Sequence, residues 1–208
     1  MADIFDEIDE DLKRDRMQVL WTRYGKIGMT AVVSIVLLVG AIQSYKAWKT
    51  SESEASAAAF QQALTSDDIM EALETRRAQM TEGYAMLAQF QIAAEQAATG
   101  NLKAAEAAYL KLAANTSLDP IYQQAAALLS VMVAPKDGEL APLLARLVDL
   151  ETADGPWQSM ALETSAGLLL RTGDRNSALV KFKNLVEMAD IPEGMRQRAD
   201  RMAAMLSN

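Results

Sequence analysis

The carboxylates are the side chains of this chain whose type and spacing could support chemistry. They cluster in two runs, DEIDEDLK (residues 6–13) and TSDDIMEALE (65–74). Neither run has the alternating ligands and central glycine of a calcium-binding loop. Glu71 and Glu74 share one helix face with Arg76 and Arg77 just beyond, which is typical of a helix surface in solvent. We therefore expect no metal site in these runs.

Other catalytic chemistry is limited by what the 208 residues lack. There is no histidine and no cysteine, which excludes a Ser-His-Asp triad, a thiolate nucleophile and a zinc-thiolate site. The segment ATGNLKAAEA (98–107) lacks the spacing of a phosphate-binding loop. After residue 50 the chain has 21 acidic and 13 basic residues, which argues against nucleic-acid binding. We expect a protein that is not an enzyme, with no cofactor, no small-molecule substrate and no nucleic-acid partner.

The strongest local signal is a stretch without charge from Ile27 to Tyr45, between Lys26 and Lys46. Its length is about that needed to cross the roughly 30 Å hydrocarbon core of a bilayer. A buried core helix and a cleaved signal peptide are the alternatives, and both fit less well: core helices are seldom apolar all round, and the segment before the stretch is long. We predict a transmembrane signal anchor over residues 25–48 that contacts the lipid bilayer. It is marked by apolar residues along its length (Ile27, Val33, Leu38, Ile42) and by aromatic residues at its rims (Trp21, Tyr24, Tyr45, Trp48).

Basic residues predict the orientation of this anchor. Five lysines and arginines precede the uncharged stretch Ile27–Tyr45 and two follow it closely, so residues 1–24 should stay in the cytoplasm, with a short amphipathic helix. The remainder would be exported, giving a single-pass membrane protein. Residues 49–80 would be a helical connector or a degenerate first repeat. No Gly or Pro occurs from Ala41 to Glu82, so the anchor helix could continue outward, or a new helix could start at Ser51; the sequence leaves both open.

A repeat follows. Three segments align on their glycines: GNLKAAEAAYLKL, GELAPLLARLVDL and GDRNSALVKFKNL. The residues five, nine and twelve positions after each glycine fall on one helical face, as a small or medium residue, a large one and a leucine. Pro120, Pro156 and Pro192 recur every 36 residues. The predicted repeat-packing residues are Gly100, Ala105, Tyr109, Gly138, Leu143, Leu147, Gly173, Ala178 and Phe182.

Each predicted unit consists of a proline, a helix, a glycine turn and a second helix. Proline suits a first helical turn, and glycine suits the left-handed residue after a helix. Such a pair cannot bury its apolar face alone, so the units should stack into an all-α solenoid. We expect repeats over 81–118, 119–155 and 156–191, with a closing helix over 192–206, within a domain covering 81–208.

These residues resemble the tetratricopeptide repeat, most clearly in the first and third units. The whole layout further resembles the ancillary subunit of the bacterial Sec translocon, a family with a cytoplasmic tail, one membrane helix and an exported tetratricopeptide-like domain. That resemblance implies a protein of the bacterial inner membrane with a periplasmic carboxyl-terminal domain. It also implies a protein-interaction module whose partners are translocon subunits and a periplasmic chaperone or emerging clients. The alternative is an envelope scaffold or assembly adaptor, in division or outer-membrane biogenesis. Candidate partner-contacting residues on the first helices are Tyr84, Gln91, Tyr122, Trp157, Glu163 and Arg171.

Overall fold

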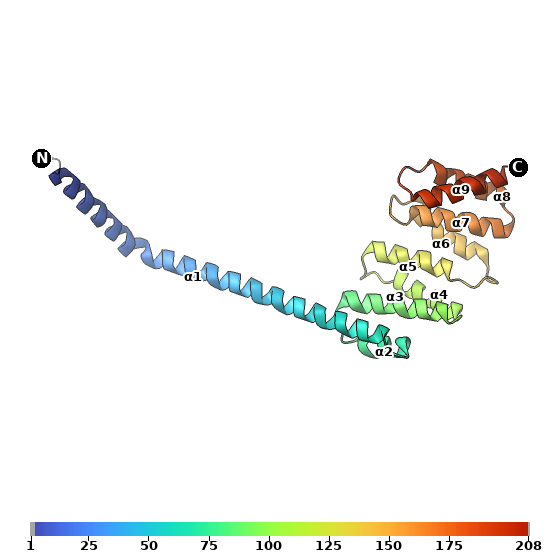
Figure 1. The fold of residues 1–208 in the computed structure, drawn as a ribbon, viewed down its shortest axis with the longest axis horizontal. Coiled ribbons are helices and arrows are strands. Elements are labelled where there is room, and N and C mark those ends of the chain that lie inside the picture. Colours follow the sequence, from blue (N-terminus) through green and yellow to red (C-terminus); the bar gives the residue numbers. More distant parts are fainter. Residues whose placement is uncertain (1–2, 208) are drawn as a thin grey trace. The chain divides into compact units, whose positions relative to one another are not determined.

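The computed structural model describes the backbone of residues 3–207, and the side chains of Thr30 and of residues 34–207. Nine α-helices and no strand occur in these residues (Figure 1). Their bounds are α1 Asp3–Leu64, α2 Ile69–Arg77, α3 Glu82–Ala98, α4 Leu102–Ala113, α5 Pro120–Met132, α6 Leu140–Thr152, α7 Gln158–Thr172, α8 Arg175–Glu187 and α9 Glu193–Leu206. The predicted all-α class is confirmed.

The chain divides into two compact units, with the boundary between Ala55 and Ser56. Helix α1 runs through Ser51, the possible new start, without a break before Leu64. No proline occurs over this stretch, so every residue keeps the backbone amide that α1 needs for its hydrogen bonds. The amphipathic pattern predicted for residues 1–24 concerns side chains outside the described ones.

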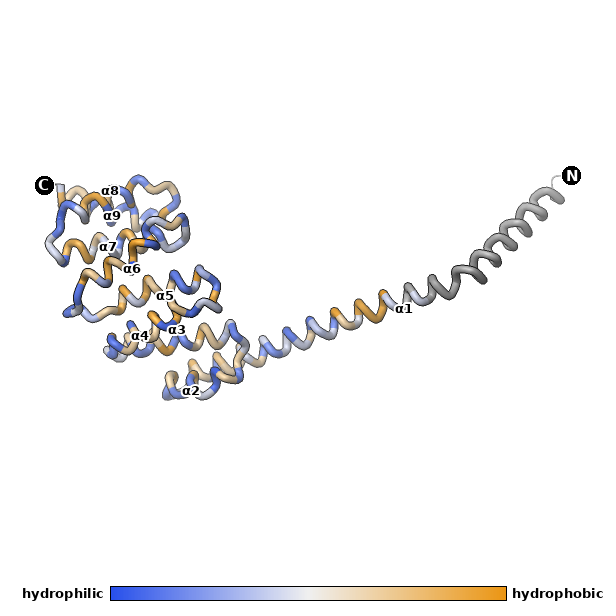
Figure 2. The backbone as a smooth tube through the Cα atoms, turned by 180° about the vertical axis from the view of Figure 1, so that it is seen from behind, coloured by the Kyte–Doolittle hydropathy of each residue, from blue (hydrophilic) through white to orange (hydrophobic). Residues whose placement is uncertain are grey.

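The first unit carries the described part of the predicted membrane segment. Leu38 and Ile42 are exposed, within a band of apolar residues along α1 (Figure 2). The side chains of Ile27 and Val33 lie outside the described ones. A search of the described residues for a helix long and apolar enough to span a bilayer finds none.

Four apolar clusters make up the core of the second unit, and they follow the chain in order. The clusters join the end of α1 with α2 and α3, then α3 with α4 and α5, then α5 with α6 and α7, and finally α7 with α8 and α9. Each cluster therefore contains one helical hairpin and the first helix of the next. This arrangement is that of a solenoid, in which each repeat completes the core of its neighbour.

Capping residues fix where several of these helices start. The carboxylate of Asp68 accepts a hydrogen bond from the Glu71 amide at 2.9 Å and begins α2. Asp119 accepts from the Ile121 amide at 3.0 Å, with Pro120 in the first turn of α5. Pro156 lies just before α7, and Pro192 is the residue that caps α9. The recurring prolines thus mark the starts of α5, α7 and α9.

Each predicted unit contains one pair of consecutive helices. Helices α3 and α4 lie within 81–118, α5 and α6 within 119–155, α7 and α8 within 156–191, and α9 within 192–206. The end of α1 and α2 precede them within 49–80. The consecutive hairpins are those expected of tetratricopeptide-like repeats.

Candidate interaction surface

Two glycine turns set the geometry of the first and third of these hairpins. Gly100 and Gly173 have φ values of 83° and 82°, in the left-handed region that glycine adopts without strain. The amide of the next residue donates to the carbonyl five residues earlier in both turns: Asn101 to Gln96 at 2.8 Å, and Asp174 to Leu169 at 3.0 Å. Each turn therefore closes the first helix with a Schellman motif and starts the second almost at once.

Asp174 also caps the second helix of its hairpin. Its Oδ1 accepts a hydrogen bond from the Ser177 amide at 3.0 Å. This bond favours the charged carboxylate, so it lowers the pKa of Asp174 below the ordinary value. The Gly-Asp pair in the sequence thus supplies both the end of α7 and the start of α8.

The middle turn differs from the other two. Gly138 does not have a positive φ, so the left-handed turn expected here from the alignment of the three glycines is wrong for this position. Its amide donates to the carbonyl of Pro135 at 3.1 Å, and a Cβ on Gly138 would lie 3.2 Å from the same oxygen. The longer loop after α5 makes this turn with Pro135 instead of a Schellman motif. Pro142 fits the first turn of α6, where its missing amide hydrogen has no partner to lose.

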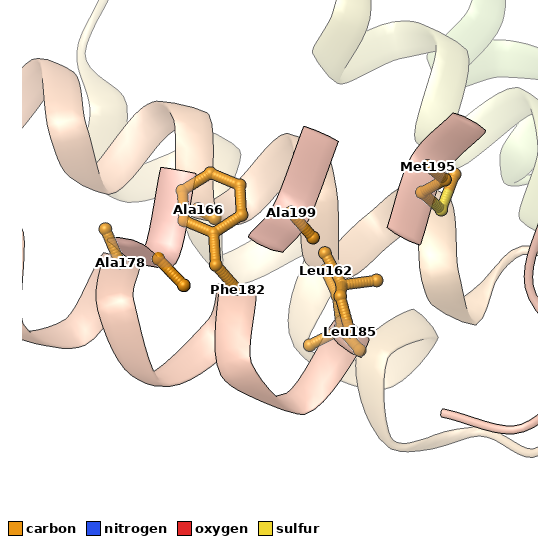
Figure 3. Packing of buried hydrophobic residues seen from close by; sticks show 8 residues of the cluster. Leu162, Ala166, Ala178, Phe182, Leu185, Met195 and Ala199 are labelled. Atoms are coloured by element: carbon orange, nitrogen blue, oxygen red, sulfur yellow. The ribbon is translucent and has the colours of Figure 1, made fainter. Parts of the chain in front are cut away.

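Small residues let the paired helices approach closely. Ala105 and Ala178, five residues after their glycines, are both fully buried, as are Leu143 and Leu147 in the middle hairpin to within a few per cent. The large residues of the outer hairpins, Tyr109 and Phe182, are also buried. Burial raises the pKa of the Tyr109 hydroxyl. Figure 3 shows the last cluster, with side chains of α7, α8 and α9 converging.

Ion pairs join each hairpin to the next. Glu106 of α4 binds Arg146 of α6 at 2.6 Å. A second pair links Glu151 at the end of α6 with Lys181 of α8, at 2.5 Å. These pairs connect successive second helices and are partly shielded from water, so they fix how one hairpin sits on its neighbour.

The first helices are connected in a similar way. Glu163 of α7 makes two hydrogen bonds with Arg198 of α9, at 2.9 and 3.0 Å. This contact raises the pKa of Arg198 above its ordinary value. Arg171, at the end of α7, donates to the carbonyl of Lys136 in the preceding unit. Two of the six predicted partner-contacting residues, Glu163 and Arg171, therefore have roles within the array.

The remaining four lie on α3, on α5 and before α7. Tyr84 packs near Phe60, with ring centroids 6.0 Å apart. The side-chain amide of Gln91 donates a hydrogen bond to the Glu95 carboxylate at 2.8 Å, on the same helix. Both side chains are half-buried and contribute to local packing.

Trp157 lies against the first turn of α5, the turn that carries Tyr122. The indole Nε1 of Trp157 donates to the carbonyl of Ile121 at 2.9 Å, which sets Trp157 against the first turn of α5. Tyr122 is 44% exposed and Ile121 is 41% exposed. Ile121 is absent from the predicted set. The only signal for it in the sequence was its place beside a recurring proline.

A charged depression lies between α4, α6 and the loop that joins α5 to α6. It has a volume of about 420 Å³, and its charged lining residues are Lys103, Glu106, Asp137, Glu139 and Arg146. The Arg146 guanidinium is held by Glu106, so the basic and acidic groups largely compensate each other. Among the described residues, no group of three or more His, Cys, Asp or Glu side chains could hold a metal ion.

Comparison with known proteins agrees with this geometry. A family model described as a tetratricopeptide repeat-like domain matches residues 18–197. Searches of curated proteins and of solved structures found no match. Repeat domains of this type bind proteins and are typically non-catalytic, so the array is a protein-interaction module. The chain belongs to the tetratricopeptide repeat-like domain family.

Proposed function

We propose that this protein is a membrane-tethered interaction module of the bacterial inner membrane. In this proposal residues 25–48 cross the membrane, the amino terminus is cytoplasmic, and the helical array works in the periplasm beside the Sec export channel. There it binds translocon subunits and a periplasmic chaperone or emerging clients. The stacked hairpins support the binding role, and the resemblance of the whole layout to the ancillary translocon subunit supports the location.

The observation that carries the tether is the exposure of α1 over residues 35–39. These five consecutive aliphatic residues are 49–68% exposed. Successive residues of an α-helix are about 100° apart, so five in a row cover the whole circumference. A protein groove would cover one side of such a helix, whereas lipid surrounds it. An apolar surface on all sides therefore favours the bilayer as its environment.

The rim of this apolar band supports the same proposal. Tyr45 and Trp48 are exposed, with ring centroids 6.2 Å apart. Lys46 and Lys49 are exposed beside them. Aromatic rings and lysines of this kind suit the headgroup region, where an apolar body and a polar end meet different surroundings.

The orientation can be tested by protease digestion of intact spheroplasts. A tag after Asn208 should be lost and a tag before Met1 should be kept, because only the periplasmic side is reachable. Detergent lysis is the control, and it should allow both tags to be cleaved. Protection of the tag after Asn208 in intact spheroplasts would contradict the exported location.

The partner can be tested by mild-detergent purification of the full chain, followed by mass spectrometry. The matched control has residues 27–45 replaced by an unrelated membrane helix. Translocon subunits captured by the native chain and lost with the replaced helix would support a channel subunit that docks through the bilayer. Capture of a different envelope complex by both chains would refute the translocon role and favour the scaffold alternative.

A further inference from the structure

The surface where α5 and α7 begin combines exposed apolar groups from two units. Ile121 and Tyr122 are exposed in the first turn of α5, and the Trp157 indole is bonded to the Ile121 carbonyl at 2.9 Å. The loop before α7 lies close as well, because a Cβ on Gly155 would be 3.9 Å from the Gln124 side chain. The exposed prolines that precede these residues adjoin them in sequence. We call the surface of Pro120, Ile121, Tyr122, Pro156 and Trp157 the helix-start patch.

The charged residues nearest to the helix-start patch in sequence are acidic. Residues 112–135 and 147–170, which include the patch, contain five acidic residues and no lysine or arginine. Two of the five, Glu151 and Glu163, are ion-paired with α8 and α9. Asp119 and Asp154 are exposed directly beside the patch. The rim therefore presents negative charge to a partner.

Side chains of this kind are suited to anchoring a partner. Tyr and Trp dominate the energetics of many interfaces, since each offers a large apolar area and loses few rotamers on binding. The hydrogen bond of Trp157 fixes its ring before any partner arrives, which lowers the ordering cost of association. Two other exposed aliphatic residues of the array, Val148 and Val180, lie on second helices beside Asp149 and Lys181.

We propose that the helix-start patch binds a polypeptide segment in which an aliphatic or aromatic side chain is flanked by lysine or arginine. The apolar side chain packs against Ile121, Tyr122 and Trp157, and the flanking cations meet Asp119 and Asp154. This inference rests on the proposed interaction function and adds the chemistry of the partner. It does not depend on the membrane location or on the translocon.

The experiment uses the full chain in nanodiscs of phosphatidylcholine, with empty nanodiscs as the blank. The probe is a fluorescein-labelled peptide, Lys-Lys-Ser-Leu-Phe-Leu-Ser-Lys-Lys, and binding is followed by fluorescence anisotropy. One matched peptide has glutamate in place of every lysine, and the other has serine in place of Leu-Phe-Leu. We expect the lysine peptide to bind at least about tenfold more tightly than either matched peptide at low salt. The advantage over the glutamate peptide should shrink at high salt, because exposed charges are screened.

Protein variants locate the site. Tyr122→Ala should weaken binding of the lysine peptide about tenfold or more, as expected for an anchoring aromatic residue. Val180→Ala, which shortens a comparably exposed side chain on α8, should leave binding unchanged. Equal loss in both variants, or none in Tyr122→Ala, would overturn the assignment to this patch.

Charge variants test the rim. The double change Asp119→Asn and Asp154→Asn should weaken the lysine peptide severalfold and leave the glutamate peptide no weaker. Asparagine can still cap α5, so the fold is kept. The control, Glu187→Gln with Asp200→Asn, removes two exposed charges from α8 and α9 and should have no effect. Equal effects of the two double variants would refute the charge complementarity.

The outcomes separate this inference from the proposed function. Failure of the lysine peptide to bind better than its two matched peptides overturns the patch assignment, whatever complex the full chain captures from membranes. Failure to capture translocon subunits, while the lysine peptide still binds at the patch, overturns the proposed translocon role and leaves the partner chemistry standing.

Discussion

Ala178 is the position at which a single added group should perturb the array most clearly. It is fully buried where α8 meets α7 and α9, in a cluster with Ala166, Phe182 and Ala199. Replacing it with leucine adds three carbons to a space that has no exposed side. Overpacking of this kind costs about 1–3 kcal/mol in the free energy of unfolding. For a domain of this size about 2–4 °C of melting temperature is lost per kcal/mol, so the Ala178→Leu variant should melt roughly 2–12 °C lower.

The assay is thermal unfolding of the full chain, followed by circular dichroism at 222 nm. Val180→Leu is the matched control, because it adds a carbon to the same helix at an exposed position. Surface substitutions of this kind usually change the free energy of unfolding by less than about 0.5 kcal/mol. Equal melting temperatures for the Ala178→Leu variant and the unaltered chain would refute the close approach of α7, α8 and α9 at this point.

Substitutions at a glycine turn, a helix cap and an ion pair test three further features of the array by the same unfolding measurement. Gly173→Ala should destabilise the array by about 1 kcal/mol, because the positive φ at this position strains any residue with a Cβ. Gly167→Ala, in the middle of α7, should instead stabilise it by up to about 1 kcal/mol. A Gly173→Ala variant that is more stable than the Gly167→Ala variant would contradict the left-handed turn at Gly173. The lowered pKa of Asp174 makes its stabilising contribution depend on pH: the contribution is present above an ordinary pKa of 3.8 and is lost as the pH falls through the lower pKa of the folded state. The free energy of unfolding should therefore fall over that pH range in the unaltered chain and fall less in Asp174→Asn. Parallel curves of stability against pH for the two proteins would exclude this role. Glu163→Gln should lower the free energy of unfolding by at most about 1 kcal/mol, and by less at high salt, since its partner Arg198 is largely exposed. A larger loss that does not depend on salt would contradict the interpretation of this contact as an exposed ion pair.

Much of the second unit could be predicted from residue spacing alone. The offsets of five, nine and twelve residues fall on buried positions after all three glycines, because residues at these spacings share one face of the second helix. The recurring prolines likewise fall at the starts of α5, α7 and α9. A local rule sufficed in these places, because the residues that form each turn are neighbours in sequence.

Other features depend on contacts that spacing does not encode. The turn at Gly138 follows from the loop after α5, and an alignment of glycines cannot distinguish it from the other two. Glu163, which is predicted to contact a partner, bonds with Arg198, which is 35 residues away and lies on α9. The hydrogen bond from Trp157 to the Ile121 carbonyl likewise joins residues that are 36 positions apart. Side chains between repeats can be assigned only when the stacking of those repeats is known.

The sharing of each apolar cluster between a hairpin and the next first helix also determines an order of assembly. A hairpin that has just been synthesised still presents one unfilled apolar face, and it is completed when the following helix becomes available. Helices α3 and α4 can therefore pack fully once α5 has emerged, while α7 and α8 wait for α9. The array can therefore fold one hairpin at a time from its amino-terminal end. At each stage one apolar face stays uncovered, and a chaperone could bind there. The closing helix α9 covers the last apolar face, that of α7 and α8.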